Sequence, residues 1–282
     1  SGDYIRDLLL WMNAPKAAKE RLDANEWRAL AHLIKQELGL DIEADGELVA
    51  AERLCAAEGK WAQVWSRFCE SPGQYPGLPE LLERVPVPNL LANPVNYPSV
   101  NARDESNLES ELTKLVDDTA SVTRKKLLEL EAIHGARRRT LWAKLDKAPW
   151  ASVLSPLARV AELSSSSFGG LSPEELGKAY EQEGWKVDAT VLEAVKACRS
   201  NHQTKIVERI LAAIYQPWLA DLNERFQKHV QAKGYPGEGR VGEAAAEYLA
   251  DGELVFFIDG LRLDVAHQLV GLMEAQGINP NM

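Results

Sequence analysis

Apolar residues return every three or four positions along most of the chain, a spacing that predicts helices rather than strands. The first run ends before Pro15, because proline cannot continue a helix interior. The second run has Asn25 as its expected N-cap and Gly39 as its expected end. Two further runs, 48–55 and 61–68, continue the pattern. The apolar positions of the first two runs are Ile5, Leu8, Leu9 and Met12, then Trp27, Leu30, Leu33, Ile34 and Leu38.

Two longer periodic segments, at about 104–134 and 203–232, predict the largest helices of the chain. Each has an apolar stripe that needs a partner along its length, so we expect an antiparallel helical hairpin with shorter helices around it. Pro217 lies inside the second segment and predicts a kink or a break. Between the two, Ser172 followed by Pro173 has the pattern of a helix start. The predicted fold class is mainly α.

A proline-rich stretch, 71–98, interrupts the helical pattern and marks the first expected boundary. We therefore divide the chain into three regions. Residues 1–98 form an N-terminal helical region with a proline-rich connection, and residues 99–245 form a helical region that contains the two long helices. Residues 246–282 differ in pattern and form the third region.

Composition narrows the class of protein. The 282 residues carry a net charge of −10, which excludes a basic nucleic-acid surface over the whole chain. No apolar run approaches the roughly 20 residues that span a bilayer, so no membrane partner is expected. Cys55, Cys69 and Cys198 are odd in number and lack CxxC spacing. This usage favours reduced thiols and a cytoplasmic location over a disulfide framework or a zinc finger.

Basic residues gather at Arg137, Arg138 and Arg139. Two interpretations stay open for this cluster. It is either a solvated face balanced by nearby carboxylates, or a docking patch for an acidic partner or a phosphate backbone.

Residues with the pattern of a chemical site occur near the C-terminus. The run 254–258 is continuous, β-branched and aromatic, as in a buried parallel strand, and helical spacing returns after Leu261. Asp259 follows the expected strand, at the end where α/β sheets bind ligands, and offers a hard oxygen ligand to a divalent metal. Arg262 offers a two-point contact to phosphate. The structural alternative is an ordinary Asp-Gly turn, with Asp264 complementing the helix dipole.

The run 255–265, Val-Phe-Phe-Ile-Asp-Gly-Leu-Arg-Leu-Asp-Val, resembles the first catalytic motif of the alkaline phosphatase superfamily. Its continuation through Val265-Ala266-His267-Gln268-Leu269 is similar to PglZ proteins of BREX bacteriophage-defence systems. The stretches 142–163 and 217–226 also resemble PglZ-type helical segments.

The resemblance implies a metal-dependent phosphatase or phosphodiesterase with an α/β catalytic domain, in which zinc is the expected metal. It assigns Asp259 as a metal ligand and Arg262 as a phosphate contact, with Asp264 and His267 in support. Residues 246–282 would be the first strand–helix unit of that domain. The chain ends before a nucleophile or further metal ligands. We therefore expect an N-terminal fragment that has no catalytic residue and is inactive alone.

The expected role of such a fragment is to bind other BREX proteins, among them the methyltransferase component. Nucleic acid is a partner that the parent protein allows but the net charge does not indicate. The alternative is a helical scaffold or adaptor without phosphatase ancestry.

Overall fold

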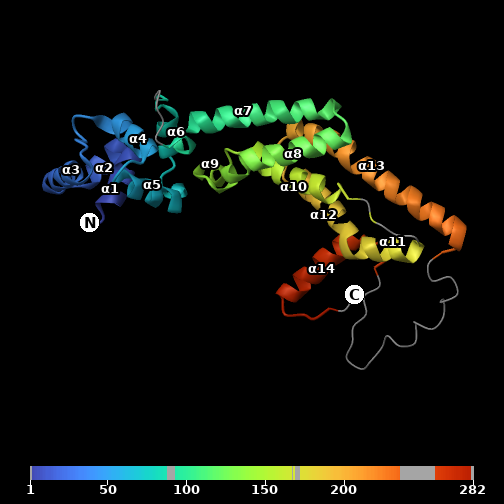
Figure 1. Ribbon diagram of the computed structural model, residues 1–282. Coiled ribbons are helices and arrows are strands. Elements are labelled where there is room, and N and C mark those ends of the chain that lie inside the picture. The colour runs from blue at the N-terminus through green and yellow to red at the C-terminus, as the bar shows by residue number, and fades with distance from the viewer. Residues whose placement is uncertain (1, 88–92, 167, 169–171, 236–257, 281–282) are drawn as a thin grey trace. The chain divides into compact units, whose positions relative to one another are not determined.

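The computed structural model describes residues 2–87, 93–166, 168, 172–235 and 258–280, and these are mainly helical, with no strand among them (Figure 1). The prediction of a mainly α fold is confirmed for these ranges. Residues 254–257 of the expected strand lie outside them, and Ile258 is exposed and outside any strand. The α/β strand–helix unit therefore stays a prediction.

Contacts divide the chain into two compact units. Unit 1 contains residues 1–110 and 134–152, and unit 2 contains residues 111–133 and 153–282. Residues 134–152 thus return to the first unit after the chain has entered the second. The expected boundaries at residues 98 and 245 stay predictions.

Unit 1 is built from short helices around one apolar core. Its core includes Leu8, Leu54, Phe68 and Trp142, each fully buried. The helices are α1 (Tyr4–Asn13), α2 (Pro15–Arg21), α3 (Ala24–Leu38), α4 (Gly46–Ala56), α5 (Trp61–Glu70), α6 (Leu78–Glu83), most of α7 (Pro98–Lys114), and α9 (Leu141–Lys144).

The ends of α3 show how local sequence sets helix boundaries. Gly39 ends the helix in the left-handed conformation, at φ +66°, as predicted. The N-cap is Asp23 rather than the expected Asn25. The Asp23 carboxylate accepts hydrogen bonds from the backbone N–H of Asn25 and of Glu26, and Glu26 bonds back to the N–H of Asp23. This reciprocal pair satisfies more backbone donors than a cap at Asn25.

Unit 2 holds α8 (Ala120–His134, to residue 133), most of α10 (Pro149–Leu163), α11 (Pro173–Ala179), α12 (Trp185–Lys196), α13 (Asn201–Lys233) and α14 (Leu263–Ala275). α11 and α12 pack on α13, and α14 packs on α12 (Figure 1). The Ser172 hydroxyl caps α11 as expected, accepting from the N–H of Glu175 at 3.2 Å. None of the helices in the described ranges is long and apolar enough to span a membrane.

The two predicted long helices have different outcomes. The expected helix at 104–134 is broken, because α7 ends at Lys114 and α8 begins at Ala120, with Asp118 in an extended conformation between them. Asp118 and Thr119 lie at this break, and aspartate and threonine are residue types that compete with helical hydrogen bonding. α13 continues through Pro217 as one helix, so of the two expected outcomes, a kink or a break, the break is absent.

Arg124 of α8 contacts α13, whereas the expected antiparallel pairing along the two segments stays a prediction. Its guanidinium donates to the carbonyl oxygen of Ile214 on α13 at 2.6 Å, and to the Ser164 hydroxyl at 3.1 Å. Pro217 has no N–H for the carbonyl oxygen of Ala213, so this turn of α13 lacks one internal hydrogen bond. Arg124 therefore joins three segments of unit 2.

Candidate functional site

The predicted metal ligand lies in a turn that leads into α14. Asp259 is exposed, and Gly260 follows it at φ +69°, a conformation that strongly favours glycine. The next residues bring the chain into α14, whose first turn contains Asp264. Gly260 is therefore needed for the turn itself, whatever further role the Asp259 carboxylate has.

Arg262 and Asp264 bind each other across this turn. Nε of Arg262 donates to Oδ1 of Asp264 at 3.0 Å, and Nη2 donates to Oδ2 at 3.1 Å. The hydrogen bonds to Asp264 raise the pKa of Arg262 above its usual value. Asp264 is 1% exposed, whereas the Arg262 side chain is 55% exposed. Two of the five guanidinium N–H donors are thus engaged, and the outer part of Arg262 faces solvent.

His267 points toward α12. Its ring stacks on the indole of Trp185, with a centroid distance of 4.0 Å and an interplanar angle of 17°. The Nε2 atom of His267 is buried and has no hydrogen-bond partner among the described residues. The predicted supporting residues Asp264 and His267 therefore both face the protein.

The positions of Asp259, Asp264 and His267 show whether the described residues could hold a metal ion. No three His, Cys, Asp or Glu side chains converge anywhere in the described ranges. Asp264 is already held by Arg262, and His267 by its stack on Trp185. Asp259 alone stands open to solvent, so the described residues do not fit a complete metal centre.

The sequence analysis missed a buried carboxylate in α12. Asp188 is 7% exposed and accepts hydrogen bonds from two phenol groups, Tyr180 and Tyr215, the second at 2.6 Å. Burial, then the bond to Asp188, raises the pKa of both tyrosines. Tyr180 opens a π-helical segment, 180–184, that lies between α11 and α12. The available signal was an aspartate flanked by Val187 and Ala189 on a buried helix face.

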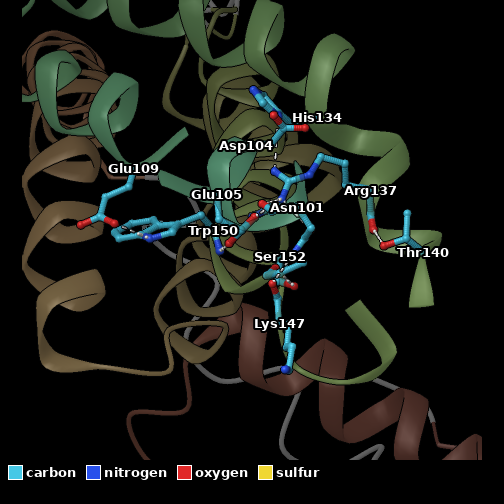
Figure 2. A network of polar contacts seen from close by, with 12 residues as sticks. Asn101, Asp104, Glu105, Glu109, His134, Arg137, Thr140, Lys147, Trp150 and Ser152 are labelled. Carbon is cyan, nitrogen blue, oxygen red and sulfur yellow. Dashed lines mark hydrogen bonds and ion pairs between the residues drawn. The ribbon is translucent and has the colours of Figure 1, made fainter. Parts of the chain in front are cut away.

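The three arginines of the basic cluster lie in three different environments. Figure 2 shows that of Arg137. Arg137 forms an ion pair with Glu105 of α7 at 2.8 Å, and their side chains are 11% and 10% exposed. Arg138 donates to the carbonyl oxygen of Ala151 at 3.1 Å. Arg139 is exposed. Of these three arginines, Arg139 is therefore the one that could bind a partner without first breaking an internal contact.

Glu105 also caps the start of α10. Its carboxylate accepts from the backbone N–H of Trp150 at 2.6 Å and from that of Ala151 at 3.2 Å. Asn101 extends the network by donating to the carbonyl oxygen of Lys147 at 2.7 Å and accepting from Arg137 at 2.9 Å (Figure 2). Negative charge near a helix N-terminus is favourable, so this network fixes α7, the arginine segment and the start of α10 together within unit 1.

A groove of about 470 Å³ lies beside this network. Its polar lining includes Glu83, which forms an ion pair with Lys147, and Glu105, which is held as described. The lining also contains the side chains of Pro98, Trp142, Pro149 and Trp150. Glu83, Glu105 and Lys147 of the lining are thus engaged in ion pairs.

Comparisons with known proteins do not assign the chain. No family model, no curated protein and no solved structure matches it.

Proposed function

We propose that this chain is the N-terminal portion of a PglZ-like metal-dependent phosphatase or phosphodiesterase of a BREX anti-phage defence system, and that it binds other BREX proteins. The observation that carries the proposal is the run 255–265 together with the turn it forms at Asp259. Asp259 is exposed ahead of α14, while Arg262 and Asp264 brace the turn. In the parent enzyme Asp259 would be one metal ligand, completed by residues from elsewhere.

The proposed role of the chain itself is interaction. Its described residues are helical and supply no converged metal set. Arg139 is the exposed member of the basic cluster and is the residue we assign to docking on an acidic partner surface. Arg137 and Arg138 support it by fixing the segment against α7 and α10.

Titration calorimetry of this chain with the purified BREX methyltransferase tests the interaction. We expect Arg139→Glu to weaken binding by about tenfold, or about 1.4 kcal/mol, and the wild-type affinity to fall with added salt. Arg84→Glu is the matched control, because Arg84 is also an exposed arginine of unit 1. Absence of binding, or an equal loss in both variants, contradicts the proposal.

A second test addresses the proposed relationship to phosphatases and phosphodiesterases. We expect no phosphodiester hydrolysis by this chain with zinc or manganese, and loss of hydrolysis in the full-length parent on Asp259→Asn. Activity of this chain that Asp259→Ala removes would overturn the proposed inactivity.

A helical adaptor without phosphatase ancestry is the second candidate. It is favoured by the packing roles of Arg262, Asp264 and His267, which account for these residues without any chemistry. In that case Asp259→Asn changes neither metal binding nor activity of a longer chain.

A further inference from the structure

The buried carboxylate of Asp188 lies on the face of α12 that packs against α14 (Figure 1). Trp185, three residues before Asp188, stacks on His267 of α14. Residues three apart share one face of a helix, so Asp188 lies on the same face as Trp185. Asp264 precedes His267 by the same spacing and is 1% exposed. The carboxylates of Asp188 and Asp264 are therefore both buried at the contact between α12 and α14.

The two aspartates have different partners. Asp264 accepts its hydrogen bonds from the Arg262 guanidinium, at 3.0 and 3.1 Å. Asp188 accepts its two from the hydroxyl groups of Tyr180 and Tyr215, and within the described residues it forms no ion pair. Neutral donors leave the negative charge of a buried carboxylate uncompensated. Two buried negative charges thus meet at this contact, and Arg262 brings positive charge beside them.

The charge of Arg262 also acts on the groups around Asp188. Burial, and then the bond to Asp188, raises the pKa of Tyr180 and of Tyr215, and the positive charge of Arg262 opposes this rise in both. The raised pKa of Arg262 has its first cause in the hydrogen bonds to Asp264, and the charge of Asp188 adds to it. Salt screens exposed charges that lie more than about 10 Å apart, so this mutual influence fits groups that are close together.

The backbone near Tyr180 is shaped for its contact with Asp188. Tyr180 begins the π-helical segment 180–184, a departure from α-helical geometry that is frequent at functional sites. A Cβ atom at Gly184 would lie 2.5 Å from Cδ2 of Tyr180, closer than van der Waals contact allows. The segment therefore requires glycine at 184 for the Tyr180 ring to lie where its hydroxyl reaches Asp188.

We propose that Arg262 is the shared counter-ion of Asp264 and Asp188, and that Asp188 is thereby a positioning residue for the turn that carries Asp259. The two tyrosines fix the Asp188 carboxylate between α12 and α13, and Arg262 connects this anion to the start of α14. Asp259 lies three residues before Arg262, so the position of Arg262 limits that of Asp259. A metal-binding role of the turn rests on the proposed function, whereas its position does not.

Nuclear magnetic resonance of the chain labelled with 3-fluorotyrosine tests the contact between Arg262 and the tyrosines of Asp188. Arg262→Gln removes a positive charge beside the hydroxyl groups of Tyr180 and Tyr215, so we expect it to shift the fluorine signals of these two residues. The other signals of the seven tyrosines should stay in place. Tyr180→Phe and Tyr215→Phe assign the two signals.

Arg209→Gln on α13 is the matched control for this measurement. The Arg209 side chain is 63% exposed, against 55% for Arg262, and it also pairs with an aspartate of unit 2. The control should leave the signals of Tyr180 and Tyr215 unchanged. Unchanged signals in Arg262→Gln, or an equal shift in both variants, overturn the proposal.

Hydrogen exchange tests the positioning role of Asp188. Asp188→Asn should raise the exchange rates of the amides at the start of α14 by about tenfold, as the loss of a local contact with a charged group does. The same substitution in the Arg262→Gln background should give no further rise, because its effect is carried by Arg262. A further tenfold rise shows independent effects and overturns the proposal.

The two measurements stay decisive under other failures. If Asp188→Asn does not fold, the fluorine signals decide alone, since Arg262 is mostly exposed and its substitution leaves the core of unit 2 intact. Neither measurement uses a BREX protein or a phosphodiester. A failed titration with the methyltransferase therefore counts against the proposed function and not against the positioning role of Asp188.

Discussion

Arg137→Met should destabilise unit 1 strongly, although sequence alone makes Arg137 look like a surface residue. The substitution keeps much of the aliphatic stem and removes the guanidinium that pairs with Glu105 at 2.8 Å. The Glu105 carboxylate then stays 10% exposed without its cation. Removing one partner of a buried ion pair costs about 3–5 kcal/mol, because the remaining charge is desolvated and uncompensated.

The expected cost lies at the lower end of this range. Glu105 keeps its two hydrogen bonds from the N–H groups of Trp150 and Ala151, and it stays at the N-terminus of α10. We therefore expect a loss of about 3 kcal/mol in the free energy of unfolding. With a urea m-value of about 2 kcal/mol/M, the midpoint should fall by about 1.5 M.

The assay is urea unfolding followed by tryptophan fluorescence, with Arg139→Met as the matched control. Arg139 is exposed and two residues away, so its substitution should change stability by less than about 0.5 kcal/mol. Hydrogen exchange provides a second readout, since the loss of stability should lower the protection of the core amides of unit 1 in Arg137→Met but not in Arg139→Met. Equal stability of the two variants refutes the argument that Arg137 is an internal residue.

Three further predictions each rest on one local feature: a hydrogen bond, a buried thiol and a backbone angle. Tyr215→Phe removes the 2.6 Å bond to Asp188 and should cost about 1.5–3 kcal/mol in chemical unfolding. The pKa values of Tyr180 and Tyr215 are raised in the folded state, so this stabilisation is complete below the unfolded value of about 10 and declines as pH rises through the folded values. The absorbance of tyrosine phenolate measures the ionisation of these groups. If Tyr180 and Tyr215 both ionise in the folded protein at the ordinary tyrosine pKa, the argument that their pKa values are raised is wrong. Burial raises the pKa of the Cys55 thiol to about 12, so Cys55 should react with a disulfide reagent at pH 8 only after unfolding. Gly260→Ala forces alanine to φ +69° and should cost about 1 kcal/mol, whereas Asp259→Asn should leave the melting temperature unchanged.

Local signals were sufficient for most helix boundaries but not for the long-range arrangement. Gly39 and Ser172 act where a helix end is decided by neighbours within a few residues, and both were predicted correctly. The break at Asp118 was missed because the apolar spacing of 104–134 resembles one helix on either side of it. Of the two outcomes expected at Pro217, a kink or a break, the break is absent, because helix continuity also depends on contacts from residues far away in sequence, such as that of Arg124 with Ile214.

The candidate site was harder to predict, because residue type does not reveal which partner a side chain has. Three consecutive arginines look alike in sequence, yet Arg137 is buried against Glu105 and Arg139 is exposed. The partners Glu105 and Asn101 lie more than thirty residues upstream, and no spacing rule connects them to Arg137. Asp188 is a similar case, since its two tyrosine donors come from a π-helical segment and from α13.

The turn at Asp259 shows how packing accounts for residues that the sequence assigned to chemistry. Arg262 and Asp264 were expected to serve phosphate binding and its support, and in the structure they bond to each other at the start of α14. Asp264→Ala removes the acceptor of both Arg262 hydrogen bonds and should loosen this turn. Asp259→Asn should leave the turn in place, because Asp259 is exposed. Hydrogen exchange of the amides at the start of α14 checks this, and equal exchange in the two variants contradicts it.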